Sequence, residues 1–112
     1  MTGIYSITDK INGKMYIGYC KKFSNRKGQH FRHLRNNTHP NEYLQNAYNK
    51  HGEINIVFEI IEECEERFLY ALEHYWVTIL NTLNRDFGYN LKPTDPNKLS
   101  GGKLKEIGRA HV

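Results

Sequence analysis

Two short runs of β-branched and aromatic residues flank an Asn12-Gly13 pair near the start of the chain, and this feature constrains the fold most. The runs cover residues 3–8 and 14–20, and their composition and length are typical of β-strands. Asn-Gly suits a tight turn between antiparallel strands, because both residues tolerate positive φ. The sequence therefore predicts a β-hairpin whose turn covers residues 9–13.

Three later segments have apolar residues at helical spacing. The first begins near residue 23. The second opens at residues 38–40, with a proline in the first turn, and stops at Gly52. The third runs from residue 65 to about residue 84, and residues 54–61 before it suit a more buried strand. The residues expected on one side of these helices are Phe23, Arg26, His30, Leu34, Tyr43, Leu44, Ala47, Tyr48, Leu69, Leu72, Trp76, Ile79, Leu80 and Leu83. The prediction is an α/β (α+β) fold of order β-β-α-α-β-α, with a small, mainly antiparallel three-stranded sheet flanked by three helices.

The length of 112 residues fits one compact domain. The apolar pattern ends after Leu91, so we expect a domain over residues 1–91 and a linker or tail over residues 92–112. No stretch approaches the roughly 20 apolar residues of a membrane span, and residues 1–7 do not resemble a secretory leader. We therefore expect a cytoplasmic protein that is not secreted and does not contact membranes. Cys20 and Cys64 are too few for a disulfide framework and are expected to be free thiols.

Charge is unevenly distributed along the chain, whose formal net charge is +4. Residues 20–35 contain six cations and no acid, whereas residues 59–66 contain five acids and no base. The cations are Lys21, Lys22, Arg26, Lys27, Arg32 and Arg35. A surface divided in this way would steer a polyanion to one side of the protein. Two ordinary solvated faces would give the same pattern, and charge alone favours neither interpretation.

One carboxylate, Glu73, falls along the edge of the apolar stripe of the third helix, four residues after Leu69 and three before Trp76. A partly desolvated carboxylate must be paired, hydrogen-bonded or bound to a cation. An ion pair with Arg26 would satisfy it and is the simpler interpretation of the pattern. A metal-binding or catalytic role is the alternative.

Arg26 and His30 lie one turn apart on the first helix, where a guanidinium could bind phosphate and an imidazole could transfer a proton. An ordinary basic surface helix would contain the same residues. Tyr5 and Tyr16 lie on the two arms of the hairpin and share a sheet face if the loop has an even number of residues. Gly18 would then leave that face open to a ligand or to backbone. Tyrosines on strands are more often packing residues.

Gly3-Ile4-Tyr5 and Tyr16-Ile17-Gly18, with ten residues between them, resemble the paired motif of the GIY-YIG nuclease superfamily. The further matching elements, in order, are Arg26 with His30, Asn49-Lys50-His51-Gly52, Glu73, and Gly88-Tyr89-Asn90. The resemblance covers about residues 1–91, and five elements in order make it specific. The chain is most similar to the N-terminal catalytic domains of phage intron-encoded homing endonucleases, which share His39 and the Leu44-Gln45 stretch.

The resemblance implies a Mg²⁺- or Mn²⁺-dependent endonuclease that hydrolyses phosphodiester bonds of double-stranded DNA. The catalytic residues that it implies are Tyr5, Tyr16, Arg26, His30, His39, Glu73 and Asn90. Glu73 would be the metal ligand, Arg26 would stabilise charge on the scissile phosphate, and Tyr5 would activate the attacking water. The residues expected to contact DNA are Lys21, Lys22, Lys27, Arg32 and Arg35. We expect a monomeric domain with no small-molecule substrate.

Residues 99–104 resemble the start of the linkers that follow this domain in homing endonucleases, so residues 92–112 are expected to lead towards a DNA-binding domain. A restriction or repair nuclease of the same fold is an alternative within the class. From other classes, a noncatalytic DNA-binding module or a structural interaction protein would also use charged faces. Glu73 argues against a pure DNA binder, since a carboxylate beside a polyanion only weakens binding.

Overall fold

The computed structural model describes residues 1–92, and residues 93–112 of the expected linker lie outside the described residues. The strands and helices are β1 (Gly3–Asp9), β2 (Met15–Cys20), α1 (Phe23–Arg35), α2 (Glu42–His51), β3 (Ile56–Glu63) and α3 (Leu69–Leu80). Short 3-10 turns cover Glu53–Asn55 and Glu66–Phe68. The predicted order β-β-α-α-β-α is confirmed. No helix within residues 1–92 is long and apolar enough to cross a membrane.

The sheet has the strand order β2-β1-β3 and is antiparallel throughout. The predicted hairpin joins β1 to β2, and Gly13 has a φ of 77° in the turn. Its register pairs Tyr5 with Gly18 and Ile7 with Tyr16. Directly paired residues share a sheet face. Tyr5 and Tyr16 therefore point to the same side, because six residues separate the paired Thr8 and Met15 and the condition of an even-numbered loop is met.

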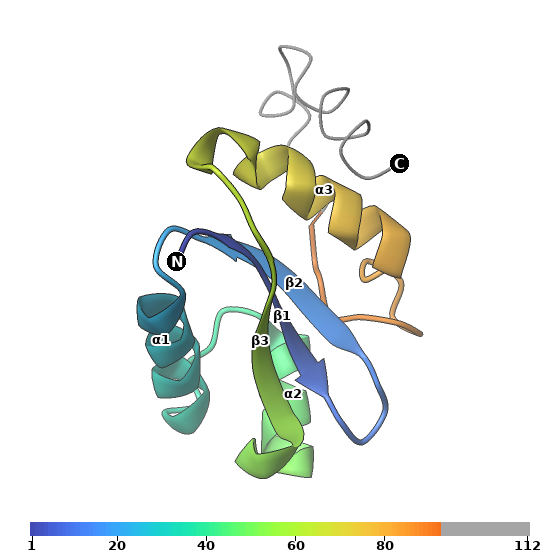
Figure 1. Ribbon diagram of the computed structural model, residues 1–112. Coiled ribbons are helices and arrows are strands. Elements are labelled where there is room, and N and C mark those ends of the chain that lie inside the picture. The colour runs from blue at the N-terminus through green and yellow to red at the C-terminus, as the bar shows by residue number, and fades with distance from the viewer. Residues whose placement is uncertain (93–112) are drawn as a thin grey trace.

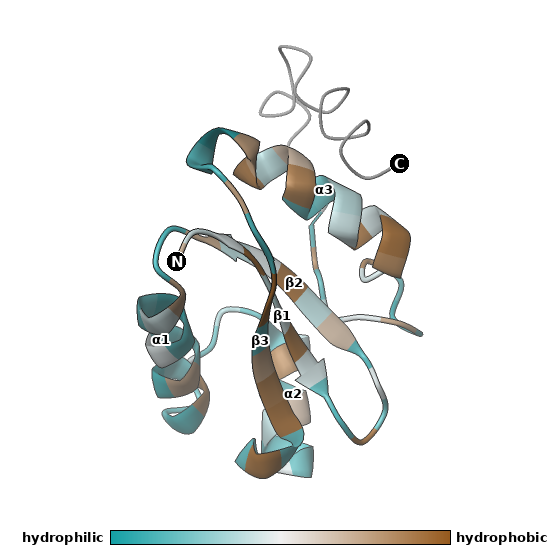
Figure 2. Cartoon of the chain, in the orientation of Figure 1, coloured by the Kyte–Doolittle hydropathy of each residue, from teal (hydrophilic) through white to brown (hydrophobic). Residues whose placement is uncertain are grey.

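Two cores cover the two faces of the sheet, because side chains alternate along each strand. Figure 1 shows α1 and α2 on one side of the sheet and α3 on the other. The first core contains Tyr5, Ile7, Cys20, Phe31, Leu34, Leu44, Ala47, Ile56, Phe58 and Tyr89. The second core contains Ile4, Ile17, Leu69, Ala71, Leu72 and Val77. Figure 2 shows the hydrophobic residues mainly in the strands and α3, while α1 is mostly hydrophilic.

The predicted boundaries of two helices were wrong. Residues 38–40 precede α2 instead of opening it, because Asn41 is its N-cap and accepts a hydrogen bond from the Leu44 N–H at 3.1 Å. At its other end α2 stops at Gly52, which has a φ of 85°. α3 is shorter than predicted at both ends. It begins only after the second 3-10 turn, and Asn81 ends it in the left-handed conformation, with a φ of 54°.

The shortened α3 changes which residues it buries. Leu83, predicted to face the core, lies beyond the helix and is 37% exposed, while Ile79 in the last turn is 56% exposed. Tyr43 at the start of α2 is also exposed, at 40%. The predicted stripe is otherwise inward-facing, since Leu69 and Leu72 are buried.

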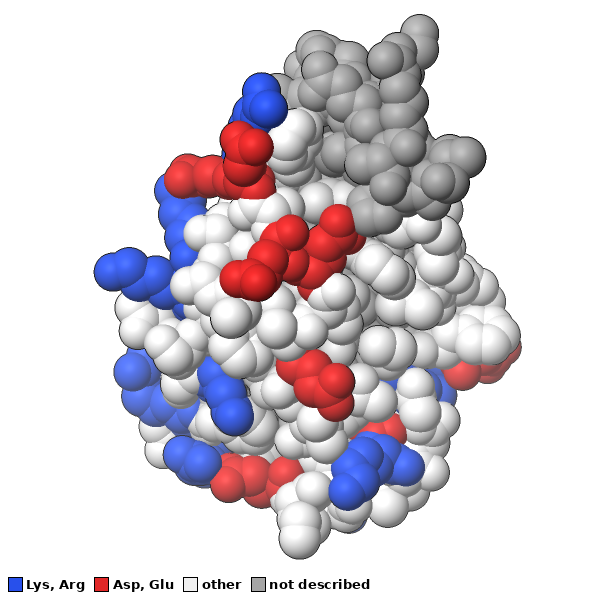
Figure 3. All heavy atoms as spheres, in the orientation of Figure 1, with Lys and Arg blue, Asp and Glu red and all other residues white. Residues whose placement is uncertain are grey.

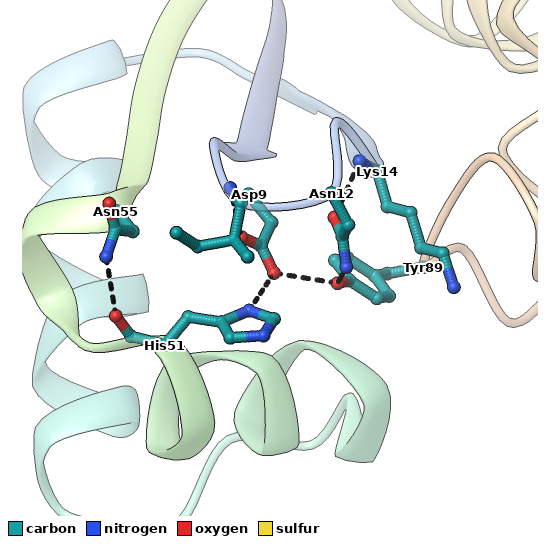
Figure 4. Close-up of polar contacts among 7 residues, drawn as sticks. Asp9, Asn12, Lys14, His51, Asn55 and Tyr89 are labelled. Carbon is teal, nitrogen blue, oxygen red and sulfur yellow. Dashed lines mark hydrogen bonds and ion pairs between the residues drawn. The ribbon is translucent and has the colours of Figure 1, made fainter.

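A buried carboxylate closes the hairpin end of the sheet. Asp9 is fully buried, and its Oδ2 accepts hydrogen bonds from His51 Nδ1 at 2.6 Å and from the Tyr89 hydroxyl at 2.9 Å. Asn12 donates a further bond to Tyr89 Oη at 2.9 Å. Figure 4 shows how these side chains converge from the hairpin turn, the end of α2 and the segment after α3. Because a buried carboxylate is costly without partners, this network ties the three segments together.

Candidate active site

All seven residues predicted to be catalytic line one cleft of about 550 Å³. They are Tyr5, Tyr16, Arg26, His30, His39, Glu73 and Asn90. They come from both strands of the hairpin, α1, α3 and two connecting segments. The cleft is lined from both faces of β2, by Tyr16 on one side and by Ile17 and Tyr19 on the other. It therefore follows the β2 edge of the sheet, between α1 and α3.

Tyr5 and Tyr16 pack on the α1 side of the sheet. Tyr5 is 2% exposed, and its ring stacks on Phe58 with centroids 4.6 Å apart. The rings of Tyr5 and Tyr16 lie 6.3 Å apart. A side chain at Gly18 would collide with the Tyr5 ring. The open space predicted at Gly18 is therefore filled by Tyr5 itself and does not admit a ligand.

A chain of short hydrogen bonds runs from Tyr5 into the protein. Tyr5 Oη lies 2.7 Å from His30 Nε2, and His30 Nδ1 lies 2.7 Å from His39 Nε2. At the far end, the backbone N–H of Asn41 donates to His39 Nδ1 at 3.0 Å. The one-turn spacing of α1 places His30 on the same face as Arg26, and the loop before α2 brings His39 against it.

Burial keeps the members of this chain neutral. It lowers the pKa of His30 to about 3, and the charges of His39 and Arg26 act in the same direction. Burial also lowers the pKa of His39. The pKa of Tyr5 is raised well above its ordinary value by burial and then by Tyr16. At neutral pH both histidines are therefore uncharged and Tyr5 keeps its proton.

Arg26 and Glu73 bring opposite charges into the cleft from opposite faces of the sheet. Both side chains are half-buried. Both charges act on Tyr16. Burial and then Glu73 raise the pKa of Tyr16, whereas Arg26 lowers it. A guanidinium in such a place can bind anionic oxygens through paired donors, and a carboxylate can hold a hard cation. The cleft thus combines an anion-binding group and a cation-binding group with the hydroxyls of Tyr5 and Tyr16.

Asn90 lies against the outer edge of β2. Its Oδ1 accepts from the Ile17 N–H at 2.8 Å, and its Nδ2 donates to the Ile17 carbonyl at 2.9 Å. Beside it, Met15 donates to the Phe87 carbonyl and accepts from the Tyr89 N–H. This pairing satisfies backbone groups that an edge strand would leave open. It also holds the backbone next to Tyr16 in place.

The basic residues predicted to contact DNA lie outside the cleft. Lys21 forms an ion pair with Glu66 at 2.8 Å, and Arg35 donates two hydrogen bonds to Glu53 at 2.7 and 3.0 Å. Arg35 also lines a shallow depression on the outer side of α1. The other three predicted cations, all exposed, are Lys22, Lys27 and Arg32. Figure 3 shows basic side chains mainly along the α1 side and acidic ones over β3 and the segment before α3. Ion pairs on the exposed surface thus interrupt the separation between the basic and the acidic regions. Such exposed ion pairs are weak.

The cleft is also lined by residues that were not predicted to belong to the site, among them Tyr19, Asn41 and Tyr70. The hydroxyl of Tyr19 donates to that of Tyr70 at 3.3 Å, and their rings lie 4.9 Å apart, edge to face. Burial and this hydrogen bond raise the pKa of Tyr19 to about 12. Tyr70 could have been found from its position one helical turn before Glu73. Asn41 could have been found as a helix-capping residue type directly before Glu42.

The described residues contain no group of three or more His, Cys, Asp or Glu side chains that could hold a metal ion. Among the described residues that line the cleft, Glu73 is the one carboxylate. Zinc sites need three or four protein ligands, whereas Mg²⁺ often binds one or two carboxylates and completes its shell with water and phosphate oxygens. The donors present in the cleft therefore suit Mg²⁺ or a similar hard cation better than zinc.

Comparison with known proteins identifies similar sequences and structures. A family model described as the GIY-YIG catalytic domain matches residues 1–90. Intron-associated endonuclease 1 of Enterobacteria phage T4 is 37% identical over an alignment of 94 residues, which covers 80% of this chain and 36% of that protein. The chain thus spans little more than a third of that relative's length.

Two solved structures also resemble the chain. The catalytic domain of homing endonuclease I-TevI has a TM-score of 0.74 and 33% identity, over 82% of this chain and 99% of that domain. A glutamate-to-alanine mutant of the I-TevI catalytic domain has a TM-score of 0.75 and 32% identity, over 84% of this chain and 96% of that one.

Proposed function

Since the chain belongs to the GIY-YIG family, we propose that it is an endonuclease domain that hydrolyses phosphodiester bonds of double-stranded DNA with the help of Mg²⁺. The observation that carries this proposal is the convergence of Tyr5, Arg26, Glu73 and the histidine chain on one cleft. These side chains come from β1, α1, α3 and the loop before α2, and together they supply a guanidinium, a carboxylate, a hydroxyl and two imidazoles. Phosphodiester hydrolysis uses each of them.

Arg26 is suited to the scissile phosphate. Negative charge builds on the phosphoryl oxygens during hydrolysis, and a preorganised guanidinium stabilises it more strongly in a partly desolvated cleft than in water. The planar fork of Arg26 can donate to two oxygens at once, which also orients the phosphate for in-line attack. Lys22, directly before α1, and Lys27 and Arg32 on that helix would hold the DNA backbone outside the cleft.

Glu73 is the residue that would hold the metal ion, with waters and phosphate oxygens completing its coordination. When bound, Mg²⁺ neutralises charge on the phosphate and lowers the pKa of a bound water. The oxygen of Tyr5 lies in the same cleft and is positioned to orient the attacking water. Its raised pKa keeps the hydroxyl protonated at neutral pH, so any loss of that proton depends on nearby positive charge such as that of Arg26.

The relatives favour one biological role over another. The T4 protein is an intron-associated endonuclease, and both solved structures are catalytic domains of a homing endonuclease. We therefore favour the catalytic domain of a homing endonuclease over a restriction or repair nuclease of the same fold. A noncatalytic DNA-binding module is disfavoured, because the carboxylate of Glu73 in the cleft would oppose the binding of a polyanion.

Plasmid cleavage tests the proposal. The protein is incubated with supercoiled plasmid in Mg²⁺ or in EDTA, beside Glu73→Ala and the control Glu59→Ala, which removes an exposed β3 carboxylate. We expect cleavage only with metal, a loss of at least about 10²-fold in Glu73→Ala, and normal activity in Glu59→Ala. Metal-independent cleavage would contradict the Mg²⁺ requirement. A fully active, folded Glu73→Ala protein would contradict the metal assignment.

A further inference from the structure

We propose that Asn41 is a positioning residue for this reaction. Its backbone and side chain together set the direction of the hydrogen-bond chain through His39 and His30, so that His30 donates to the Tyr5 hydroxyl. This inference rests on the proposed function. Asn41 does not belong to the motifs that identify the family in this sequence, and its contacts appear only in the folded structure.

Besides the first backbone bond of α2, in which its carbonyl accepts from the Gln45 N–H, Asn41 makes three hydrogen bonds, each to a different segment. It is 6% exposed. Its N–H donates to His39 Nδ1 at 3.0 Å, its Nδ2 donates to the Tyr89 carbonyl at 2.7 Å, and its Oδ1 accepts from the Leu44 N–H at 3.1 Å. The residue is therefore the junction between the histidine chain, the segment after α3 and the start of α2.

The first of these bonds determines the tautomers. A backbone N–H can only donate, so His39 Nδ1 must be the acceptor and cannot carry a proton. Neutral His39 then carries its proton on Nε2 and donates it to His30 Nδ1 at 2.7 Å. His30 in turn carries its proton on Nε2 and donates it to Tyr5 Oη, also at 2.7 Å. The reverse direction would place two N–H donors face to face at His39 and Asn41.

This direction has a chemical consequence at Tyr5. His30 Nε2 already carries a proton, so it cannot accept the one on Tyr5. The hydroxyl proton of Tyr5 therefore points towards the cleft and away from His30. When negative charge develops on the Tyr5 oxygen, the His30 N–H is already in place to stabilise it. His30 thus acts as a hydrogen-bond donor to Tyr5 and not as its base.

The side chain of Asn41 keeps its N–H in place. Its anchor is Tyr89, whose hydroxyl is held by Asp9 and Asn12 at the other end of the residue (Figure 4). The next residue, Asn90, is bonded to the backbone of β2 beside Tyr16. Residues 89–90 therefore bind β2 on one side and Asn41 on the other. Through these contacts, the positions of Tyr5 and Tyr16 depend on the same anchor.

The direction of the chain can be measured without DNA. The full chain is labelled with ¹⁵N-histidine, and the imidazole nitrogens are observed by NMR at neutral pH. The resonances are assigned with single His→Gln variants. We expect both His30 and His39 to be neutral and to carry their protons on Nε2. A proton on Nδ1 of either ring would overturn the proposal, even in an active enzyme.

Substitution of Asn41 tests the positioning role. Asn41→Ser keeps a capping oxygen for the Leu44 N–H but is too short to reach the Tyr89 carbonyl. Asn41→Asp keeps the cap and the length but places an acceptor against that carbonyl. We expect both variants to lose about 10- to 100-fold in single-turnover cleavage rate, the range found when the hydrogen-bond partners that orient metal-binding histidines are removed. Asn41→Ser, which adds no charge to the cleft, should bind DNA with unchanged affinity. The imidazole resonances of His39 should shift in both.

The control is Asn25→Ser, which makes the same chemical change on the exposed side of α1 and should alter neither readout. Normal cleavage and unshifted resonances in folded Asn41→Ser would overturn the positioning role. A wild-type protein that shows the expected tautomers but cleaves no DNA would overturn the proposed function, and with it the catalytic consequence. These two failures are distinguishable, since the NMR result does not depend on activity.

Discussion

Replacing Tyr5 by phenylalanine removes a single oxygen atom from the centre of the cleft, and its effect can be worked out from the structure. The ring keeps its stacking on Phe58, since the two centroids lie 4.6 Å apart. The lost hydroxyl leaves the Nε2–H of His30 without an acceptor in a site that is 8% exposed. An orphaned buried donor costs about 1–3 kcal/mol. For a domain of this size, that loss lowers the melting temperature by roughly 5–20 °C.

The expected catalytic effect is a separate loss, measured as a cleavage rate. If the Tyr5 oxygen orients the attacking water, its removal lowers the cleavage rate by at least about 10²-fold, or about 2.7 kcal/mol of transition-state stabilisation. The cleavage rate under single-turnover conditions and the melting temperature are measured on the same preparation, well below the melting transition. Tyr48→Phe is the matched control, because its hydroxyl bonds to Glu53 at 2.9 Å on the surface, away from the cleft.

The two readouts separate a catalytic tyrosine from a packing tyrosine. We expect Tyr5→Phe to lose both stability and rate, and Tyr48→Phe to keep the rate. A Tyr5→Phe protein that melts lower but cleaves at a near-normal rate would refute the reasoning. Orientation of the water would then belong to the metal ion or to Tyr16, and the bond from His30 would serve only to stabilise the fold.

Three further predictions follow from the cleft and its surroundings. Arg26→Lys should lose most of the cleavage rate but keep most of the DNA affinity, because lysine retains the charge without the paired donors. Equal losses of cleavage rate and of DNA affinity would mean that Arg26 only holds DNA. Stability should fall as the pH drops from about 6.5 towards 3. The pKa of His30 is about 3 in the folded protein and 6.5 in the unfolded chain, so the unfolded state binds more protons in that window. The melting temperatures of wild type and His30→Gln should therefore converge at low pH. DNA affinity should fall steeply as the salt concentration rises. Lys27→Ala should reduce the affinity more than Arg35→Ala, since Arg35 already binds Glu53. A larger loss in Arg35→Ala than in Lys27→Ala would place the DNA on the other side of α1.

Local spacing was sufficient to predict much of the fold. The Asn12-Gly13 turn predicted the hairpin, but the shared face of Tyr5 and Tyr16 was conditional on an even-numbered loop, which the pairing of Thr8 with Met15 supplies. The helical period placed Arg26 and His30 on one side of α1 and Glu73 along the edge of the apolar stripe of α3. These features depend only on residues close in sequence, and each strand or helix determines the relative directions of its own side chains.

Other features depended on contacts between distant parts of the chain. Asn90 binds Ile17 across 73 residues, and Asn41 binds Tyr89 across 48. The sequence indicated that His30 and Tyr5 belong to one site, but it could not say which of them donates to the other. That direction depends on the backbone N–H of Asn41, a group that every residue except proline possesses and that therefore leaves no trace in sequence. Periodicity orients side chains within one element, whereas only tertiary packing decides which donor meets which acceptor.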